Sequence, residues 1–299
     1  MSPEHGLAQS AFVLARIACE APDRARVVAS LIEQSREHLG WVLHESGPAD
    51  AEHTVLLLPG ALCTARFYDD LLAEPSISDA PIRFVASTLP GFGGTSPPDD
   101  PSMESYAALA SRLAADLRCD VVVGHSVGAN VAIEMASTGQ FSGPLVLLSP
   151  SFSRKDESMF PRVLDRLSRV LGHVPYSLML KIVGPAMKSS LPPARRDVLT
   201  DELKKNDPRF LRQQTHLYLS YLDRHGSLAQ RFCDSGTRAW VVFGERDDVG
   251  IADDERELLE STPHVNLVEI SDAGHFTLNQ KPSEIAALVL EAVKSPIPG

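Results

Sequence analysis

The sequence predicts an α/β protein whose mostly parallel, twisted sheet has helices on both faces and carries one inserted helical cap. Two observations support this fold class. Short β-branched or leucine-rich runs alternate with segments of helical periodicity in two stretches of the chain, as expected for parallel strands joined by helices. Between these stretches, from about residue 151 to 233, prolines interrupt helical patterns and no strand-like run occurs.

We therefore expect one α/β core, formed by residues 40–150 and 234–299, and a cap formed by residues 151–233. With 299 residues and 43% apolar content, the chain is long enough to bury a large core. Residues 1–39 are the least informative. Apolar positions near 12–17 and 27–32 suggest two short helices broken near Pro22, which we interpret as a helical arm packed on the core.

The elements of the core follow in order from the apolar runs and the turn residues between them. The predicted strands are 41–45, 54–58, 82–87, 121–123, 144–148, 239–243 and 265–270. The predicted helices lie at about 65–73, 104–117, 127–137, 252–260 and 282–293, with Ser102 as the N-cap of the second. In such a sheet the reactive loops lie at the carboxyl ends of the strands.

One tight turn joins the strand at 121–123 to the following helix. Ser126 lies at its tip, and Gly124 and Gly128 flank it two residues away on either side. Both flanking positions must lack a Cβ if strand and helix are to approach closely around a strained serine. This is the G-x-S-x-G pattern of a nucleophile elbow, which exposes a serine hydroxyl beside the N-terminus of a helix.

A serine needs a base, and His275 is the only late histidine that closely follows a predicted strand. The candidate acids are Asp247 and Asp248, just past the strand that ends at residue 243. The order serine, aspartate, histidine is the one found in hydrolases with a nucleophile elbow. His125 adjoins Ser126, but we expect it to point away, because neighbouring side chains diverge on a tight turn.

These residue types predict acyl transfer through a serine. His275 would take the proton of Ser126 as it attacks and later give it to the leaving group. The aspartate would fix the imidazole tautomer and stabilise the imidazolium. The oxyanion of the tetrahedral intermediate would bind the backbone N–H of Val127 and one from the loop after residue 58. Ala61 is our choice for that second donor, with Leu62 next.

The chain resembles the α/β-hydrolase superfamily, of the type with a helical cap, over about residues 40–150 and 235–295. Three segments carry the resemblance: Gly124-His125-Ser126-Val127-Gly128, Asp272-Ala273-Gly274-His275-Phe276 and Leu89-Pro90-Gly91-Phe92-Gly93-Gly94-Thr95-Ser96. The third is similar to the family's D-x-P-G-x-G-x-S loop, with Thr88 or Leu89 where Asp is usual.

The resemblance implies a catalytic triad of Ser126, Asp247 and His275. In this family the acid stands three residues after the glycine that ends its strand, which selects Asp247 over Asp248. Pro59-Gly60 stands where the family usually has His-Gly before the oxyanion residue. Haloalkane dehalogenases of the same superfamily have Asp as the nucleophile, so a serine at this position argues against dehalogenation.

The cap is where such enzymes choose their substrates, because it covers the site and excludes water. Its apolar residues at helical spacing predict an apolar pocket, with most of them burying the cap against the core: Phe160, Val163, Leu164, Leu167, Leu178, Met179, Ile182, Val183 and Met187. Its basic residues predict a solvated face from which one arginine could bind a substrate carboxylate: Arg162, Arg166, Arg169, Lys181 and Lys188.

Three functions remain open from the sequence. The first is a serine hydrolase that cleaves a carboxylic ester, thioester or lactone of a small, partly apolar substrate through an acyl-enzyme. The second is a carbon–carbon bond hydrolase or cofactor-free lyase that uses the same triad. The third is a hydrolase-fold ligand receptor without catalysis. The expected partner in each case is a small molecule.

The net charge of −11 argues against nucleic acid and against anionic membrane surfaces as partners. The four cysteines show no C-x-x-C and no metal-ligand spacing, so reduced thiols are expected, and we predict neither a metal nor a cofactor. No signal peptide or transmembrane segment is recognisable. We expect a cytoplasmic location, and a homodimer is an oligomeric state that the sequence leaves open.

Overall fold

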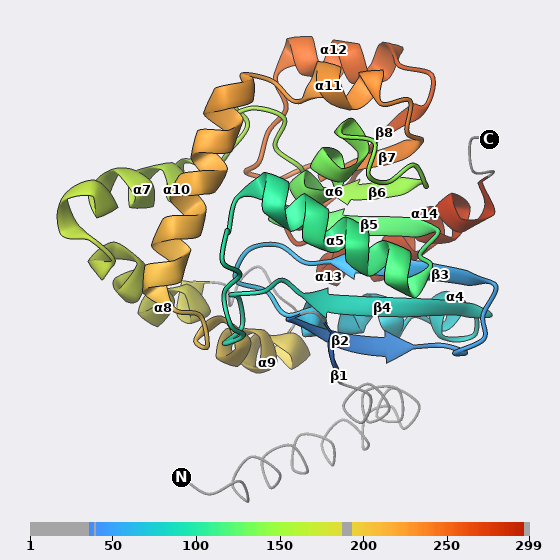
Figure 1. Cartoon of the computed structure of the whole chain (residues 1–299), viewed down its shortest axis with the longest axis horizontal. Coiled ribbons are helices and arrows are strands. Elements are labelled where there is room, and N and C mark those ends of the chain that lie inside the picture. The colour runs from blue at the N-terminus through green and yellow to red at the C-terminus, as the bar shows by residue number, and fades with distance from the viewer. Residues whose placement is uncertain (1–35, 39, 187–192, 296–299) are drawn as a thin grey trace, which may run out of the picture.

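The computed structural model describes residues 36–38, 40–186 and 193–295 of the chain (Figure 1). In this part of the chain one eight-stranded sheet forms the centre of the molecule. Its strands, in sheet order, are β1 (Arg36–His38), β2 (Trp41–Ser46), β4 (Ile82–Thr88), β3 (His53–Leu58), β5 (Val121–His125), β6 (Leu145–Leu148), β7 (Ala239–Gly244) and β8 (Val265–Ile270). From β4 to β8 all neighbours are parallel, whereas β2 pairs antiparallel with both β1 and β4.

Helices cover both faces of the sheet, which confirms the predicted fold class. The helices of the core are η1 (Ala65–Tyr68), α3 (Asp69–Leu72), α4 (Pro75–Ser78), α5 (Met103–Leu117), α6 (Val127–Ser137), α11 (Ala229–Asp234), α12 (Asp253–Ser261), α13 (Thr277–Gln280) and α14 (Pro282–Lys294). Ser102 is the N-cap of α5, as predicted, and its side chain accepts a hydrogen bond from the backbone N–H of Ser105.

The central strands are buried on both faces, which explains their uninterrupted apolar runs. In β3, Leu56 and Leu58 pack into the core under α5 and α6, whereas Val55 and Leu57 pack into the core under α3 and α14. Strand β5 is covered on both faces, and all five of its residues are buried. The segment that presents Ser126 therefore follows a strand that is buried along its whole length.

The cap is inserted between β6 and β7 and lies beside the carboxyl ends of the central strands (Figure 1). It contains α7 (Met159–Leu171), α8 (Val174–Ala186), α9 (Pro193–Leu203) and α10 (Pro208–His225). The short α11, which we had expected in the cap, contacts α6 and α12 of the core. The long α10 runs across the cap and contacts α5, α7 and α8.

Several apolar residues of the cap that were expected to be buried are exposed. These residues are Phe160, Val163, Leu167, Leu178 and Ile182. On α7, Val163 and Leu167 lie at helical spacing with Val170, which is 86% exposed. The side chain of Val183, and Met187 and Lys188 as a whole, lie outside the described residues.

At the N-terminus, most of the predicted arm lies outside the described residues. The described end of this segment, Arg36–His38, is the strand β1 and not part of a helix. It pairs with β2 through Arg36 opposite Leu43 and His38 opposite Trp41. Among the described helices, none is long and apolar enough to cross a membrane.

Candidate active site

The turn between β5 and α6 has the strained geometry that the glycine spacing predicts. Ser126 adopts φ 51° and ψ −119°, a conformation that few non-glycine residues occupy. A Cβ on Gly128 would lie 2.3 Å from the carbonyl oxygen of Leu58, and one on Gly124 would lie 2.6 Å from Cα of Ala129. Both contacts involve backbone atoms that cannot move aside. Glycine is therefore required on both sides of the serine.

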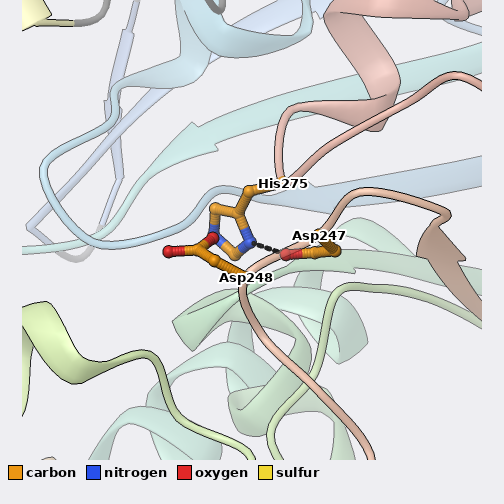
Figure 2. Close-up of side chains that lie close together, drawn as sticks. All are labelled: Asp247, Asp248 and His275. Atoms are coloured by element: carbon orange, nitrogen blue, oxygen red, sulfur yellow. Dashed lines mark hydrogen bonds and ion pairs between the residues drawn. The ribbon is translucent and has the colours of Figure 1, made fainter.

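The loops after β7 and β8 bring the predicted acid and base together. Nδ1 of His275 lies 3.0 Å from Oδ1 of Asp247 (Figure 2). The other oxygen of Asp247 accepts a hydrogen bond from Oγ of Ser149 at 2.5 Å, and the backbone N–H of Val249 donates to Oδ1 at 3.0 Å. Because the carboxylate accepts, Nδ1 carries the proton, and Nε2 of the neutral imidazole is left as the basic nitrogen.

Asp247 and His275 shift each other's pKa, so that each stabilises the charged form of the other. Burial by itself lowers the pKa of His275. The hydrogen bond and the negative charge of Asp247, together with the charges of Asp248 and Glu157, outweigh it and raise the pKa above the ordinary value of 6.5. Burial by itself raises the pKa of Asp247, but hydrogen bonds from His275 and Ser149 and the imidazolium charge hold it below its ordinary value. Asp247 therefore stays ionised while His275 is a stronger base than a free imidazole.

The prediction that His125 points away from the site is wrong. Its ring lies 4.9 Å from the ring of His275 and stacks on Phe67 at 4.5 Å. Its Nε2 donates a hydrogen bond to the backbone carbonyl of His275 at 3.0 Å. Burial, then the nearby His275, lowers the pKa of His125 to about 3, so the ring is neutral. It holds the backbone of the base in place and is not itself a proton acceptor at neutral pH.

A cavity of about 540 Å³ lies between the core and the cap. Ser126 and His275 both line it, although no hydrogen bond joins these two side chains. The cap contributes mostly apolar walls: Phe160, Pro161, Leu164, Tyr176, Met179, Leu203 and Leu211. None of the described cap arginines that we considered as carboxylate ligands lines the cavity. Arg169, for example, pairs with Asp165 of its own helix.

Backbone segments approach Ser126 from two sides. Val127 is the first residue of α6, so its N–H has no partner within the helix. On the other side, a Cβ on Gly60 would lie 3.2 Å from Cβ of Ser126, so the loop after β3 passes directly against the serine. Ala61 and Leu62 of that loop line the cavity. The choice of Ala61 over Leu62 as the second donor stays a prediction.

Other reactive groups at the site are less suited to a chemical role. The thiol of Cys63 lines the cavity, but burial raises its pKa to about 12, so it stays protonated. Within the described residues, one group of potential metal ligands is found, Asp247, Asp248 and His275, with ligand atoms within 4.8 Å of one another (Figure 2). Since Asp247 and His275 already share a hydrogen bond, this arrangement fits proton transfer better than metal binding.

The cavity also has polar residues that the sequence did not single out. Glu157 and Tyr218 line it, and they are hydrogen-bonded to each other at 2.8 Å. Glu157 follows no predicted strand and Tyr218 lies in mid-helix, so neither position stands out in the sequence. They meet only because α10 packs across the segment that leads into the cap.

The fold and the site together define a hydrolase-type α/β protein, and comparison with known families agrees. The Alpha/beta hydrolase family matches residues 55–288, which is more than half of the chain. The chain therefore belongs to the Alpha/beta hydrolase family. No significant sequence match to a curated protein was found.

Solved structures of varied description share the fold. A hydrolase from Pseudomonas aeruginosa PA01 has 18% identity and a TM-score of 0.69, with 85% of this chain and 94% of that chain covered. A bromoperoxidase from Bacillus anthracis has 14% identity and a TM-score of 0.69, covering 85% and 95%. An esterase from Exiguobacterium antarcticum has 15% identity and a TM-score of 0.67, covering 85% and 96%. At such identities the likeness shows the fold alone.

Proposed function

We propose that the protein is a serine hydrolase that cleaves a carboxylic ester, thioester or lactone of a small, partly apolar substrate. The observation that carries the proposal is the strained Ser126, which shares a cavity with a His275–Asp247 pair whose free nitrogen is Nε2. A serine activated by a neutral imidazole is the chemistry of acyl transfer. The catalytic residues are Ser126, His275 and Asp247.

The proposed reaction has two halves. Oγ of Ser126 attacks the substrate carbonyl while His275 takes its proton, and the oxyanion binds the N–H of Val127 and of Ala61 or Leu62. The imidazolium then gives the proton to the leaving alcohol or thiol, and the acyl-enzyme forms. A water molecule, deprotonated by His275, attacks the acyl carbonyl, and the acid product leaves as Ser126 regains its proton. Asp247 remains a carboxylate throughout.

The cavity supports a substrate of limited size with an apolar portion. Its volume of about 540 Å³ lies in the range of small-molecule sites, and its cap walls are mainly apolar. The esterase among the structural neighbours has the same fold, and we take ester cleavage as the first reaction to test. The carbon–carbon bond hydrolase or cofactor-free lyase and the non-catalytic receptor remain alternatives, and the experiment below distinguishes the receptor.

Turnover of p-nitrophenyl esters of varied acyl length by the wild-type protein tests the proposal. We expect hydrolysis that falls by about 10³-fold or more in Ser126→Ala and in His275→Ala, since either change removes the unit that activates the nucleophile. Hydrolysis that persists in both folded variants would contradict the proposed mechanism. Tight ligand binding without turnover in the wild type would favour the receptor.

A further inference from the structure

The long cap helix α10 presents two tyrosines to two different carboxyl groups, one buried and one partly buried. Tyr221 donates a hydrogen bond to Oε2 of Glu134 at 2.7 Å, and Tyr218 donates one to Oε2 of Glu157 at 2.8 Å. Both tyrosines are buried, and they lie one helical turn apart. The two pairs have the same chemistry but different surroundings, and the difference indicates what Glu157 does.

In the first pair, the carboxylate of Glu134 is buried and is bound by Arg231 as well as by Tyr221. Its side chain is 3% exposed, and the guanidinium of Arg231 contacts both carboxylate oxygens, at 2.6 and 3.2 Å. Glu134 does not line the cavity. This carboxylate is bound by both a tyrosine and an arginine, joins core and cap, and is not accessible to a ligand in the cavity.

The Glu157 pair is open to the cavity. Oγ of Ser151 donates to Oε2 at 3.0 Å, the same oxygen that accepts from Tyr218. No basic side chain in the described segments forms an ion pair with Glu157. The residue lines the cavity that also contains Ser126 and His275. The carboxyl group is thus held in a fixed orientation by two hydroxyls and still has lone pairs that can accept from a ligand.

The pKa of Glu157 points in the same direction. Burial raises it. Hydrogen bonds from Tyr218 and Ser151, the positive charge of His275 and a hydrogen bond from the backbone of Ser158 offset that effect only in part. The negative charge of this carboxyl group has been taken largely out of water without an ion-pair partner, so a further donor would stabilise it. A ligand with a hydrogen-bond donor would therefore stabilise the negative charge of Glu157.

We propose that Glu157 is a specificity-determining residue that accepts a hydrogen bond from a hydroxyl or ammonium group on an otherwise apolar substrate. The inference rests on the proposed function, since the cavity is taken to hold the substrate of Ser126. The donor group would lie on the part of the substrate enclosed by the cap, among Leu164, Met179 and Leu211. A site built to hydrogen-bond a polar group rejects an analogue that lacks it, because its own buried polar group is then left unpaired.

The charges along the cavity fit this assignment and disfavour an anionic substrate. Asp248 lines the same cavity as Glu157, and Arg246, the basic residue in its wall, pairs with Asp272. A carboxylate on the substrate would face like charges in a partly desolvated space. The order of preference should therefore be donor-bearing, then apolar, then anionic substrates.

Glu157 could instead serve only as a structural link between the cap and the segment after β6. A matched series of p-nitrophenyl esters distinguishes the two roles. The acyl chains of these esters end in a methyl, hydroxyl, ammonium or carboxylate group, and each end group is tested over a range of acyl lengths. A structural role would change kcat/KM for all esters alike. A recognition role changes the ratio of donor-bearing to methyl-terminated esters at the chain length that reaches Glu157.

We expect the wild-type enzyme to prefer a donor-bearing ester over its methyl partner by about tenfold at the best length. Glu157→Leu should reverse the preference, and the isosteric Glu157→Gln should reduce the preference for ammonium more than that for hydroxyl. Glu134→Gln is the matched control, since it alters a buried, tyrosine-bonded carboxyl outside the cavity and should leave the ratios unchanged. A comparison of the hydroxyl-terminated with the ammonium-terminated esters shows which donor Glu157 recognises.

The inference is overturned if the ratios of donor-bearing to methyl esters are equal in wild type, Glu157→Leu and Glu157→Gln at every chain length. If the wild type hydrolyses none of the esters, the proposed function fails instead. Thermal shifts with the corresponding non-hydrolysable amides then decide the inference. A stabilisation by donor-bearing amides that disappears in Glu157→Gln supports it, and equal shifts in both proteins contradict it.

Discussion

At the scale of single residues, the basicity of His275 depends on nearby carboxylates that together outweigh the effect of burial on its pKa, and Asp247 contributes most among them. In the sequence, Asp247 and Asp248 are adjacent and equally close to the end of their strand, so residue reasoning alone left both open. The resemblance to a family selected Asp247, and the structure places that residue at 3.0 Å from Nδ1 of His275. The contact spans two loops that are 28 residues apart, which no local pattern specifies.

A pH profile tests this contact. His275 must be unprotonated to act as a base, so kcat/KM should fall as the pH is lowered through its pKa, which Asp247 raises above 6.5. In Asp247→Asn the negative charge that raises the pKa of His275 is gone, while the burial that lowers this pKa remains. The acid limb should therefore move to lower pH, and the maximal rate should drop by roughly 10⁴-fold.

The matched variant for this profile is Asp248→Asn, which should keep most of the activity. If Asp248→Asn, rather than Asp247→Asn, abolishes hydrolysis, the assignment of the acid is wrong. An acid limb that does not move in Asp247→Asn would show that the carboxylate does not set the pKa of the base.

Two residues near the chemistry were missed or misjudged from the sequence for the same physical reason. The role of His125 depends on its contacts with Phe67 and His275, which come from other loops. That of Glu157 depends on Tyr218, 61 residues further along the chain. Local spacing predicts where a side chain leaves its own element, but not which distant groups meet it.

At the scale of elements, the backbone of the turn between β5 and α6 could be predicted, because its steric requirement involves only neighbouring residues. Gly124 and Gly128 are needed so that the backbone of α6 can pass β3 and β5 at close range. The same holds for the buried strands, whose apolar runs need no partner to be recognised. Glycine spacing and apolar runs are properties of neighbouring residues, and the sequence displays them directly.

Gly128→Ala tests the close approach at this turn. The new Cβ would lie 2.3 Å from one backbone oxygen and 2.5 Å from another, so α6 must shift and Ser126 with it. We expect a loss of about 3 kcal/mol or more in the free energy of unfolding, measured by chemical denaturation, and little remaining hydrolysis. Gly250→Ala is the control, because its nearest neighbour, the oxygen of Asp156, lies 4.0 Å away. Equal stability of the two variants would contradict the packing argument.

The orientation of α7 could not be predicted from its periodicity. Its buried residues are Leu164, Asp165 and Ser168, whereas most of its apolar residues are exposed. Asp165 is held by Arg169 at 3.0 Å and by His216 of α10 at 3.1 Å. Hydrogen bonds to a neighbouring helix, and not apolar burial alone, thus set how this helix lies.

At the scale of the whole molecule, the cap and the core are joined by buried polar contacts as well as by apolar packing. Glu134 of α6 binds Tyr221 of α10 and Arg231 of α11, so that one carboxylate connects three helices. The sequence predicted the fold class and the existence of an inserted cap from its alternation of patterns. It could not predict this connection, whose parts are separated by 87 and 97 residues.

Glu134→Ala should destabilise the protein by about 2–3 kcal/mol, because it leaves a buried tyrosine hydroxyl and a partly buried guanidinium without their partner. The value lies at the low end for a buried ion pair, since the Arg231 side chain is 33% exposed and can regain water. Tyr221→Phe, which leaves the ion pair in place, should cost only about 1 kcal/mol. Chemical denaturation measures both, and a smaller loss for Glu134→Ala than for Tyr221→Phe would contradict this account.

Labelling with a fluorophosphonate tests the central claim most directly, because this reagent reacts with a serine only when a neighbouring base activates it. We predict that the folded wild-type protein is labelled at a single position and that peptide mapping places the label on Ser126. Ser126→Ala should not be labelled, and His275→Ala should be labelled far more slowly. A folded wild-type protein that resists labelling, or a label on another residue, would contradict the claim that Ser126 is an activated nucleophile.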